Sequence, residues 1–145
     1  RIQPAQLMPC RRPNAPKSAS RRGHASTAAG GTPLALPRKI EVAAERGKTD
    51  VVRLWLSGAG RADAKCKRPL SEGDDSGSGC TLLMIAAGYG HAQLVELLLK
   101  CGAVVDLQNG AGWTALMSAV YRGRSAIVLR LLRAGADMTL RTPGG

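Results

Sequence analysis

The sequence has few aromatic residues and few histidines, and each shortage excludes a class of structure or site. Aromatic residues make up 3% of its 145 residues and Phe is absent, so a buried core must consist of aliphatic side chains. No apolar run approaches the roughly 18 residues of a membrane-spanning helix, and we predict no membrane span. The two histidines, His24 and His91, form no Ser–His–acid or Cys–His pattern, so we predict no catalytic site.

The cysteines are too widely spaced for the common metal and redox motifs. Cys10, Cys66, Cys80 and Cys101 include no pair with the two-residue spacing of a zinc knuckle or a redox motif. We therefore predict no metal site and no cofactor, and we expect reduced thiols inside a cell. Cys101 precedes Gly102 near the end of an expected helix, where a small buried side chain fits.

Charge and proline set residues 1–37 apart from the rest of the chain. The segment 1–39 contains eight Arg or Lys and no acid, whereas the segment 40–145 contains 13 basic and 10 acidic side chains. Six prolines interrupt residues 1–37 and large apolar side chains are few, so we predict a disordered basic leader. Its Arg- and Ser-rich composition is also typical of an organelle transit peptide. Its charges would allow association with nucleic acid, although no aromatic residue interleaves them to stack on bases.

The second half of the chain repeats itself. When residues 80–112 are set over residues 113–145, 12 of 33 positions are identical, all at an offset of 33. The shared positions are Thr81 and Thr114, Leu83 and Leu116, Met84 and Met117, Ala86 and Ala119, Gly90 and Gly123, Val95 and Val128, Leu98 and Leu131, Leu99 and Leu132, Gly102 and Gly135, Ala103 and Ala136, Leu107 and Leu140, and Gly112 and Gly145. A fixed period of this length is typical of a stacked-repeat architecture.

The pattern within one period predicts two short helices. Thr114 is placed to cap the first helix with its hydroxyl, and Gly123 can end that helix in a left-handed conformation. A second helix is expected from about Ser125 and stops before Gly135. Their apolar stripes are Leu116, Ala119 and Val120, and then Ile127, Val128, Leu131 and Leu132. Helices of about two or three turns do not persist alone in water, so stacking of neighbouring pairs must stabilise the fold.

A third, degenerate copy lies upstream, where residues 40–56 fit two helices with Trp55 in the core. Gly47 lies farther from Gly90 in the sequence than Gly90 lies from Gly123, so this copy is separated from the next by more than one period. The excess falls in the polar stretch 61–79, so we predict a loop inserted after the first repeat. The predicted organisation is a leader at 1–37, repeats at approximately 38–60, 76–108 and 109–141, and an inserted loop at 61–75.

These motifs resemble the ankyrin repeat. Its pattern appears as Gly79-Cys80-Thr81-Leu82-Leu83-Met84, Ala86-Ala87, Gly90-His91, Leu94-Val95, Leu97-Leu98-Leu99 and Gly102-Ala103, and it recurs from Gly112 to Asp137. Leu82 and Ala115 replace the family's Pro, while His91 stands where ankyrin repeats commonly carry a structural His. The resemblance implies an all-α ankyrin-repeat solenoid of about three helix-turn-helix repeats over residues 38–145, either a monomer or part of a longer repeat array.

The same resemblance implies a protein-interaction module, a scaffold or adaptor that binds a partner protein through its turns and concave helix face. The side chains expected there are Cys80, Tyr89, Gln108, Trp113, Tyr121, Arg122 and Arg141. Trp113 is either an anchor for the partner or a contact with a further repeat. Two alternatives stay open: the ankyrin portion of a larger enzyme, channel or ubiquitin-ligase adaptor, and nucleic-acid association through the leader. We expect an intracellular protein, in the cytoplasm or nucleus unless the leader targets an organelle.

Overall fold

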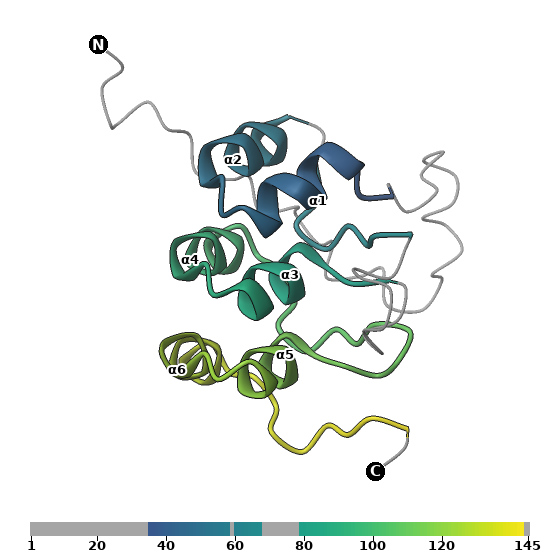
Figure 1. Ribbon diagram of the computed structural model, residues 1–145, viewed down its shortest axis with the longest axis vertical. Coiled ribbons are helices and arrows are strands. Elements are labelled where there is room, and N and C mark those ends of the chain that lie inside the picture. The colour runs from purple at the N-terminus through teal and green to yellow at the C-terminus, as the bar shows by residue number, and fades with distance from the viewer. Residues whose placement is uncertain (1–34, 59, 68–78, 144–145) are drawn as a thin grey trace, which may run out of the picture.

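The computed structural model describes residues 35–58, 60–67 and 79–143, and these residues form an all-α stack. The helices are α1 (Arg38–Glu45), α2 (Thr49–Ser57), α3 (Leu82–Tyr89), α4 (Ala92–Lys100), α5 (Ala115–Tyr121) and α6 (Ser125–Arg133). Figure 1 shows them as neighbouring pairs, α1 with α2, α3 with α4 and α5 with α6, stacked one on another. Within the described ranges no helix is long and apolar enough to cross a membrane. Most of the predicted leader (1–34) and the second half of the predicted insertion (68–78) lie outside the described residues.

Threonine caps begin the first helix of the second and third repeats, as predicted for Thr114. The hydroxyl of Thr81 accepts a hydrogen bond from the backbone N–H of Met84 at 3.3 Å, and that of Thr114 accepts one from Met117 at 3.2 Å. Both threonines are buried, so these caps satisfy backbone donors that water does not reach. Gly123 follows α5 with a φ of +66°, the left-handed conformation that the sequence predicts at this stop.

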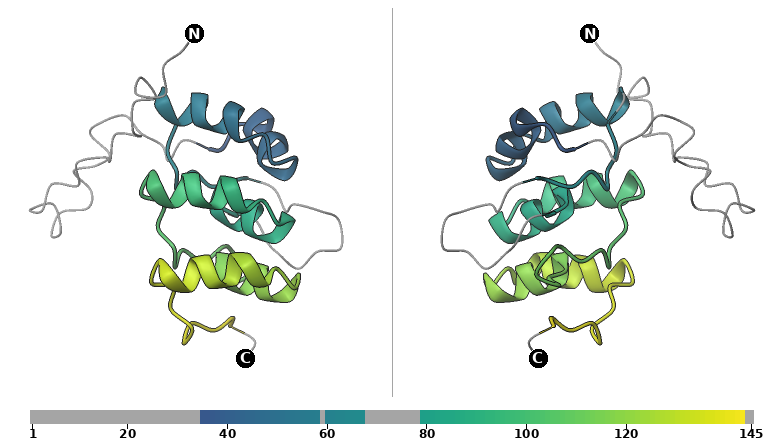
Figure 2. Two further views of the ribbon diagram at one scale, coloured as in Figure 1. Left: turned by 90° about the vertical axis from the view of Figure 1, so that its left-hand side faces the viewer. Right: turned by 90° about the vertical axis from the view of Figure 1, so that its right-hand side faces the viewer.

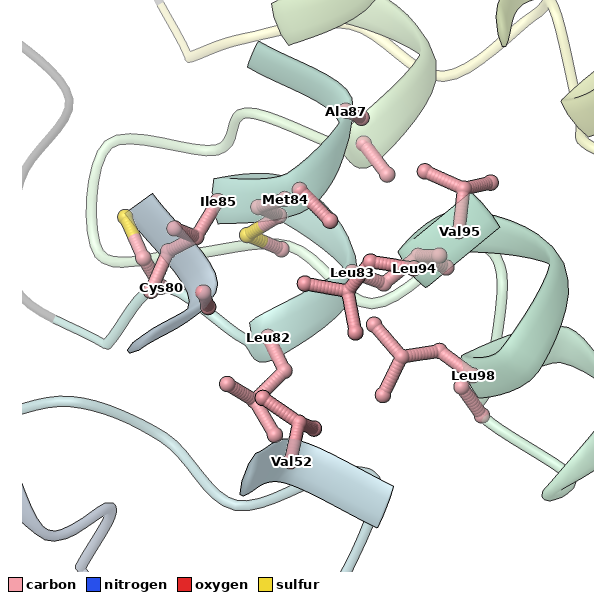
Figure 3. Close-up of a cluster of buried hydrophobic side chains, with 14 of the residues drawn as sticks. Val52, Cys80, Leu82, Leu83, Met84, Ile85, Ala87, Leu94, Val95 and Leu98 are labelled. Atoms are coloured by element: carbon pink, nitrogen blue, oxygen red, sulfur yellow. The ribbon is translucent and has the colours of Figure 1, made fainter. Parts of the chain in front are cut away.

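The middle helix pair holds the core together. Residues 82–88 of α3 are all buried, and α3 lies between α1 and α5, as the two side views of Figure 2 show. Val52 of α2 and Leu94 and Leu98 of α4 complete the cluster drawn in Figure 3. Since α3 is apolar on every side, it has no solvent-facing stripe and is stable only between two neighbours.

Hydrogen bonds also tie each repeat to the next. The Nε2 atom of His91 donates to the backbone carbonyl of Glu45 at 2.7 Å, which confirms the structural role expected for His91. The carboxylate of Asp63 accepts from the backbone N–H of Val104 at 2.8 Å. Asp106 makes the same kind of link one repeat later, also at 2.8 Å. These bonds satisfy backbone groups across the repeat boundaries and set the spacing of the stack.

Residues 61–67 of the predicted insertion pack onto the stack instead of forming a free loop. Lys65 pairs with Thr81 in an isolated antiparallel bridge, and the N–H of Cys66 donates to the carbonyl of Cys80 at 2.9 Å. Gly79, at a φ of +91°, donates its N–H to the carbonyl of Cys66 at 3.0 Å. Gly79 and Cys80 therefore lie opposite the single residue Cys66, and this arrangement is a G1 β-bulge. We call the paired residues 65–66 and 79–81 the neck, because they join the two sides of the insertion.

Two smaller expectations have different outcomes. Trp55 is half-buried and packs against the core, in agreement with the prediction. Cys101 is buried as expected, with 5% of its surface exposed, but it is disulfide-bonded. The expectation of a reduced thiol is therefore wrong at this position. The expectation was based on the spacing of the cysteines in the sequence, and such spacing indicates only local motifs.

Shortening a buried leucine should cost far more stability than shortening an exposed one. Leu98 of α4 is fully buried, whereas Leu54 of α2 is 76% exposed. We expect Leu98→Ala to lower the free energy of unfolding by about 2–5 kcal/mol because it leaves a cavity, and Leu54→Ala to change it by less than about 0.5 kcal/mol. Urea denaturation followed by far-UV circular dichroism measures both, and equal losses would contradict the assignment of Leu98 to the core.

Candidate protein-binding surface

Three of the predicted site residues lie together at the C-terminal end of the stack. They line a shallow, mostly apolar groove of about 370 Å³ between α5 and the segment that follows α6, which we call the terminal groove. Its lining residues are Trp113, Met117, Val120, Tyr121, Leu140, Arg141 and Thr142. Of these, the resemblance to ankyrin repeats predicts Trp113, Tyr121 and Arg141 as binding residues, but it does not predict the other four.

Trp113 and Tyr121 form the aromatic wall of the terminal groove. Their ring centroids are 5.4 Å apart and their planes meet at 87°, an edge-to-face contact. Trp113 is half-buried, whereas Tyr121 is 73% exposed. Positions 113, 117, 120 and 121 follow the i, i+4, i+7, i+8 spacing of one helix face. The spacing could therefore have revealed Met117 and Val120 as members of the same surface.

The corresponding face of the preceding repeat is covered. The equivalent residues one period earlier are Cys80, Met84, Ala87 and Gly88, and all four are buried at the junction with α5. In the third repeat Trp, Val and Tyr replace Cys, Ala and Gly, so the uncovered end carries larger side chains than the covered face does. A concentration of large apolar groups on an exposed face is typical of an interaction site.

Arg122 and Tyr89 meet between the second and third repeats. The guanidinium carbon of Arg122 lies 5.3 Å from the centroid of the Tyr89 ring, which is a cation–π contact. The Tyr89 ring is parallel to that of His91 at a centroid distance of 6.5 Å. His91 is hydrogen-bonded to Glu45 of the first repeat. The contacts from His91 to Tyr89 and from Tyr89 to Arg122 therefore connect all three repeats.

Gln108 and Arg141 are neighbours, but they differ in role. The Nε2 atom of Gln108 donates to the backbone carbonyls of Gly112 at 2.7 Å and Arg141 at 3.1 Å. Gln108 therefore links consecutive turns, and its amide is already engaged. The Arg141 residue is exposed and lines the terminal groove. Of the two, only Arg141 is among the residues that line the terminal groove.

The structure does not support Cys80 as a surface residue. Only 2% of Cys80 is exposed, and its sulfur accepts a hydrogen bond from Nδ2 of Asn109 at 3.4 Å. Asn109 belongs to the turn of the third repeat and covers Cys80 in the second repeat. Trp113, the equivalent residue one period later, lines the terminal groove. The sequence period places Cys80 correctly in its repeat, but it does not show that the next repeat buries it.

The fold and the repeated motifs agree with a comparison against known families. The family model for ankyrin repeats (3 copies) matches residues 40–142. The chain belongs to the ankyrin-repeat family. Ankyrin repeats are generally protein–protein interaction modules. No curated protein matches the chain. In the described part of this ankyrin domain, no group of three or more His, Cys, Asp or Glu side chains could hold a metal ion.

The third repeat of the ankyrin domain is strongly basic. The segment 110–143 contains five arginines and one acid, Asp137. Arg130 is engaged with Glu96 of α4 at 2.9 Å, and the hydrogen bonds from Thr139 lower the pKa of the Asp137 carboxyl. Among the residues that line the terminal groove, one is basic, Arg141, and most of the others are apolar.

Fluorescence should report the contact between Trp113 and Tyr121. In a Trp55→Phe background, we expect Tyr121→Ala to shift the emission of Trp113 to longer wavelength and to increase its quenching by acrylamide, because the substitution uncovers the indole. The matched control is Arg133→Ala on the exposed side of α6, which should change neither quantity. Unchanged quenching in the Tyr121→Ala variant would rule out the contact.

Proposed function

We propose that this ankyrin domain binds a partner protein through the terminal groove, and that the Arg122–Tyr89 pair belongs to the same binding surface. The uncovered face of α5 is the observation that carries the proposal. The equivalent face of α3 is buried against α5 of the next repeat, so the exposed face of α5 is of a kind that packs against another surface. Large side chains at Trp113 and Tyr121 supply the contact area that interface anchors require.

The lining of the groove indicates the chemistry of the partner segment. An aliphatic or aromatic side chain of the partner would enter between Trp113 and Leu140 and contact their apolar surfaces. An acidic residue flanking that side chain would lie near Arg141. Because the helix pairs of the stack hold the groove residues in place, little ordering entropy is lost on binding.

The other functions predicted from the sequence remain predictions. Nucleic-acid association rests on the leader, most of which lies outside the described residues. An ankyrin domain of a larger enzyme, channel or ubiquitin-ligase adaptor would use the same groove, so the proposal holds in each of those contexts. The expected intracellular location also stays a prediction.

Alanine substitutions in the groove should weaken partner binding selectively. We expect Trp113→Ala to reduce affinity about thirtyfold or more, because a buried aromatic anchor is worth at least about 2 kcal/mol. Arg141→Ala, at the edge of the groove, should reduce affinity severalfold and diminish the salt dependence. The measurement is affinity capture with the wild-type domain, followed by titration of the recovered partner against each variant.

The controls for this experiment are exposed residues of α6 that do not line the terminal groove. Arg133→Ala removes the same charge as Arg141→Ala, and Leu129→Ala removes an exposed apolar side chain of α6. Neither should affect the recovered partner. If these controls weaken binding as much as the groove variants do, or if all variants bind equally well, the terminal groove is not the binding surface.

A further inference from the structure

The neck brings two cysteines together that are distant in sequence. Cys66 and Cys80 oppose each other across the bulge, with the backbone hydrogen bond from Cys66 to Cys80 at 2.9 Å. Only 3% of Cys66 and 2% of Cys80 is exposed, and Figure 3 shows the Cys80 sulfur at the edge of the core cluster. Both side chains therefore occupy one confined site at the base of the insertion.

The two sulfur atoms interact directly. The thiol of Cys80 donates a hydrogen bond to the sulfur of Cys66, and this bond is the main reason why the pKa of Cys66 is lowered to about 6. Burial opposes that change, whereas the backbone N–H groups of Cys80 and Gly79 add to it, and the carboxylate of Glu41 raises the pKa slightly. Since the usual thiol pKa is about 8.5, Cys66 is mainly a thiolate at neutral pH, and the thiolate is the reactive form.

The backbone geometry of the neck is compatible with a disulfide bond. The N–H of Cys66 donates to the carbonyl of Cys80, so the two backbones lie within hydrogen-bond distance at the position of the cysteines. Disulfides join Cα atoms about 4.4–6.8 Å apart, and neighbouring paired strands lie about 4.7–4.9 Å apart, so a bond between Cys66 and Cys80 does not require the paired segments to separate. A thiolate next to a second cysteine that can resolve an oxidised intermediate is the arrangement of redox-sensitive sites.

We propose that Cys66 and Cys80 form an oxidation site for hydroperoxides, and that the resulting disulfide closes the neck. The Cys66 thiolate attacks one peroxide oxygen, which breaks the O–O bond, gives Cys66 sulfenic acid and releases hydroxide. The Cys80 sulfur then attacks the sulfenic sulfur, forms the S–S bond and expels the sulfenic oxygen. The Cys80 proton and a solvent proton leave with the oxygen atoms, so two thiols and hydrogen peroxide yield one disulfide and two water molecules.

The burial of both sulfurs selects the kind of oxidant. A hydroperoxide as small as hydrogen peroxide needs only a brief opening of the neck, whereas a bulky disulfide such as oxidised glutathione needs a wide one. The product would covalently join residues 61–67, which follow the first repeat, to the segment that begins α3. The two paired segments would then be joined by a covalent bond in addition to their backbone hydrogen bonds.

Peptide mapping of the full chain tests this proposal directly. Trypsin cleaves after Lys67, so Cys66 and Cys80 fall on different peptides and a linked pair is diagnostic. After treatment with hydrogen peroxide at neutral pH, we expect the linked peptides in the wild type and their loss on reduction. In Cys80→Ser the reaction should stop at Cys66 sulfenic acid, which a cyclic dione traps. In Cys66→Ser the oxidation of Cys80 should be at least about tenfold slower.

The pH dependence distinguishes a reactive thiolate from a merely accessible thiol. The oxidation rate should fall about tenfold for each pH unit below about 6, where Cys66 is protonated. Thiolate absorbance in the ultraviolet should show the same midpoint, and Cys80→Ala, which removes the side-chain hydrogen-bond donor, should raise that midpoint towards the usual thiol pKa. Far-UV circular dichroism establishes that both serine variants are folded.

Three results would overturn the proposal. These are the absence of the linked peptides, equal oxidation rates of the remaining cysteine in Cys66→Ser and Cys80→Ser, and a linked pair whose yield rises with protein concentration, which would indicate bonds between molecules. As a control, Arg133→Ala, on the exposed side of α6, should leave the formation of the Cys66–Cys80 pair unchanged.

Discussion

The burial of α3 between two neighbouring helices is the interaction on which this structure depends. Every residue from Leu82 to Gly88 is buried, so α3 cannot leave a solvent-facing side without exposing apolar surface. Helix α1 covers one side of it and α5 the other, while α4 closes the outer side. The polar links made by His91, Asp63 and Asp106 then fix the spacing that this burial requires. No single helix here, at seven to nine residues, would be stable in water without these contacts.

The same constraint creates the proposed binding surface. In this stack of three repeats, α1 packs against α3 and α3 against α5, whereas the equivalent face of α5 lines the terminal groove. At the inner junction the face of α3 is covered by α5, whereas at the outer end the equivalent face of α5 is open. The residues at that open face are larger, and the repeat that carries them is basic. The terminal groove is therefore a consequence of repetition combined with a few local substitutions, of which Trp113 and Tyr121 are the largest.

The sequence predicts local features well and predicts contacts between repeats less well. The cap at Thr114 and the stop at Gly123 follow from patterns within one repeat, whereas the structural role of His91 follows from the resemblance to ankyrin repeats. The burial of Cys80 and the pairing of residues 65–66 with 79–81 do not follow from the sequence, because both depend on segments that meet only in the stack. Leu140 was missed for the same reason, since it reaches the groove from the segment after α6. Patterns of period 3.6 report which side of a helix is buried but not which repeat covers it.

Equilibrium unfolding with a probe at each end of the stack is the most direct measurement of the central claim. Trp55 lies in the first repeat and Trp113 in the third, so Trp113→Phe and Trp55→Phe leave one reporter at either end. If both end repeats depend on contact with the middle pair, the fluorescence midpoint in urea will coincide with the far-UV circular dichroism midpoint in each variant. Separate transitions, with one end retaining its fluorescence after the helices of the other have unfolded, would contradict the account.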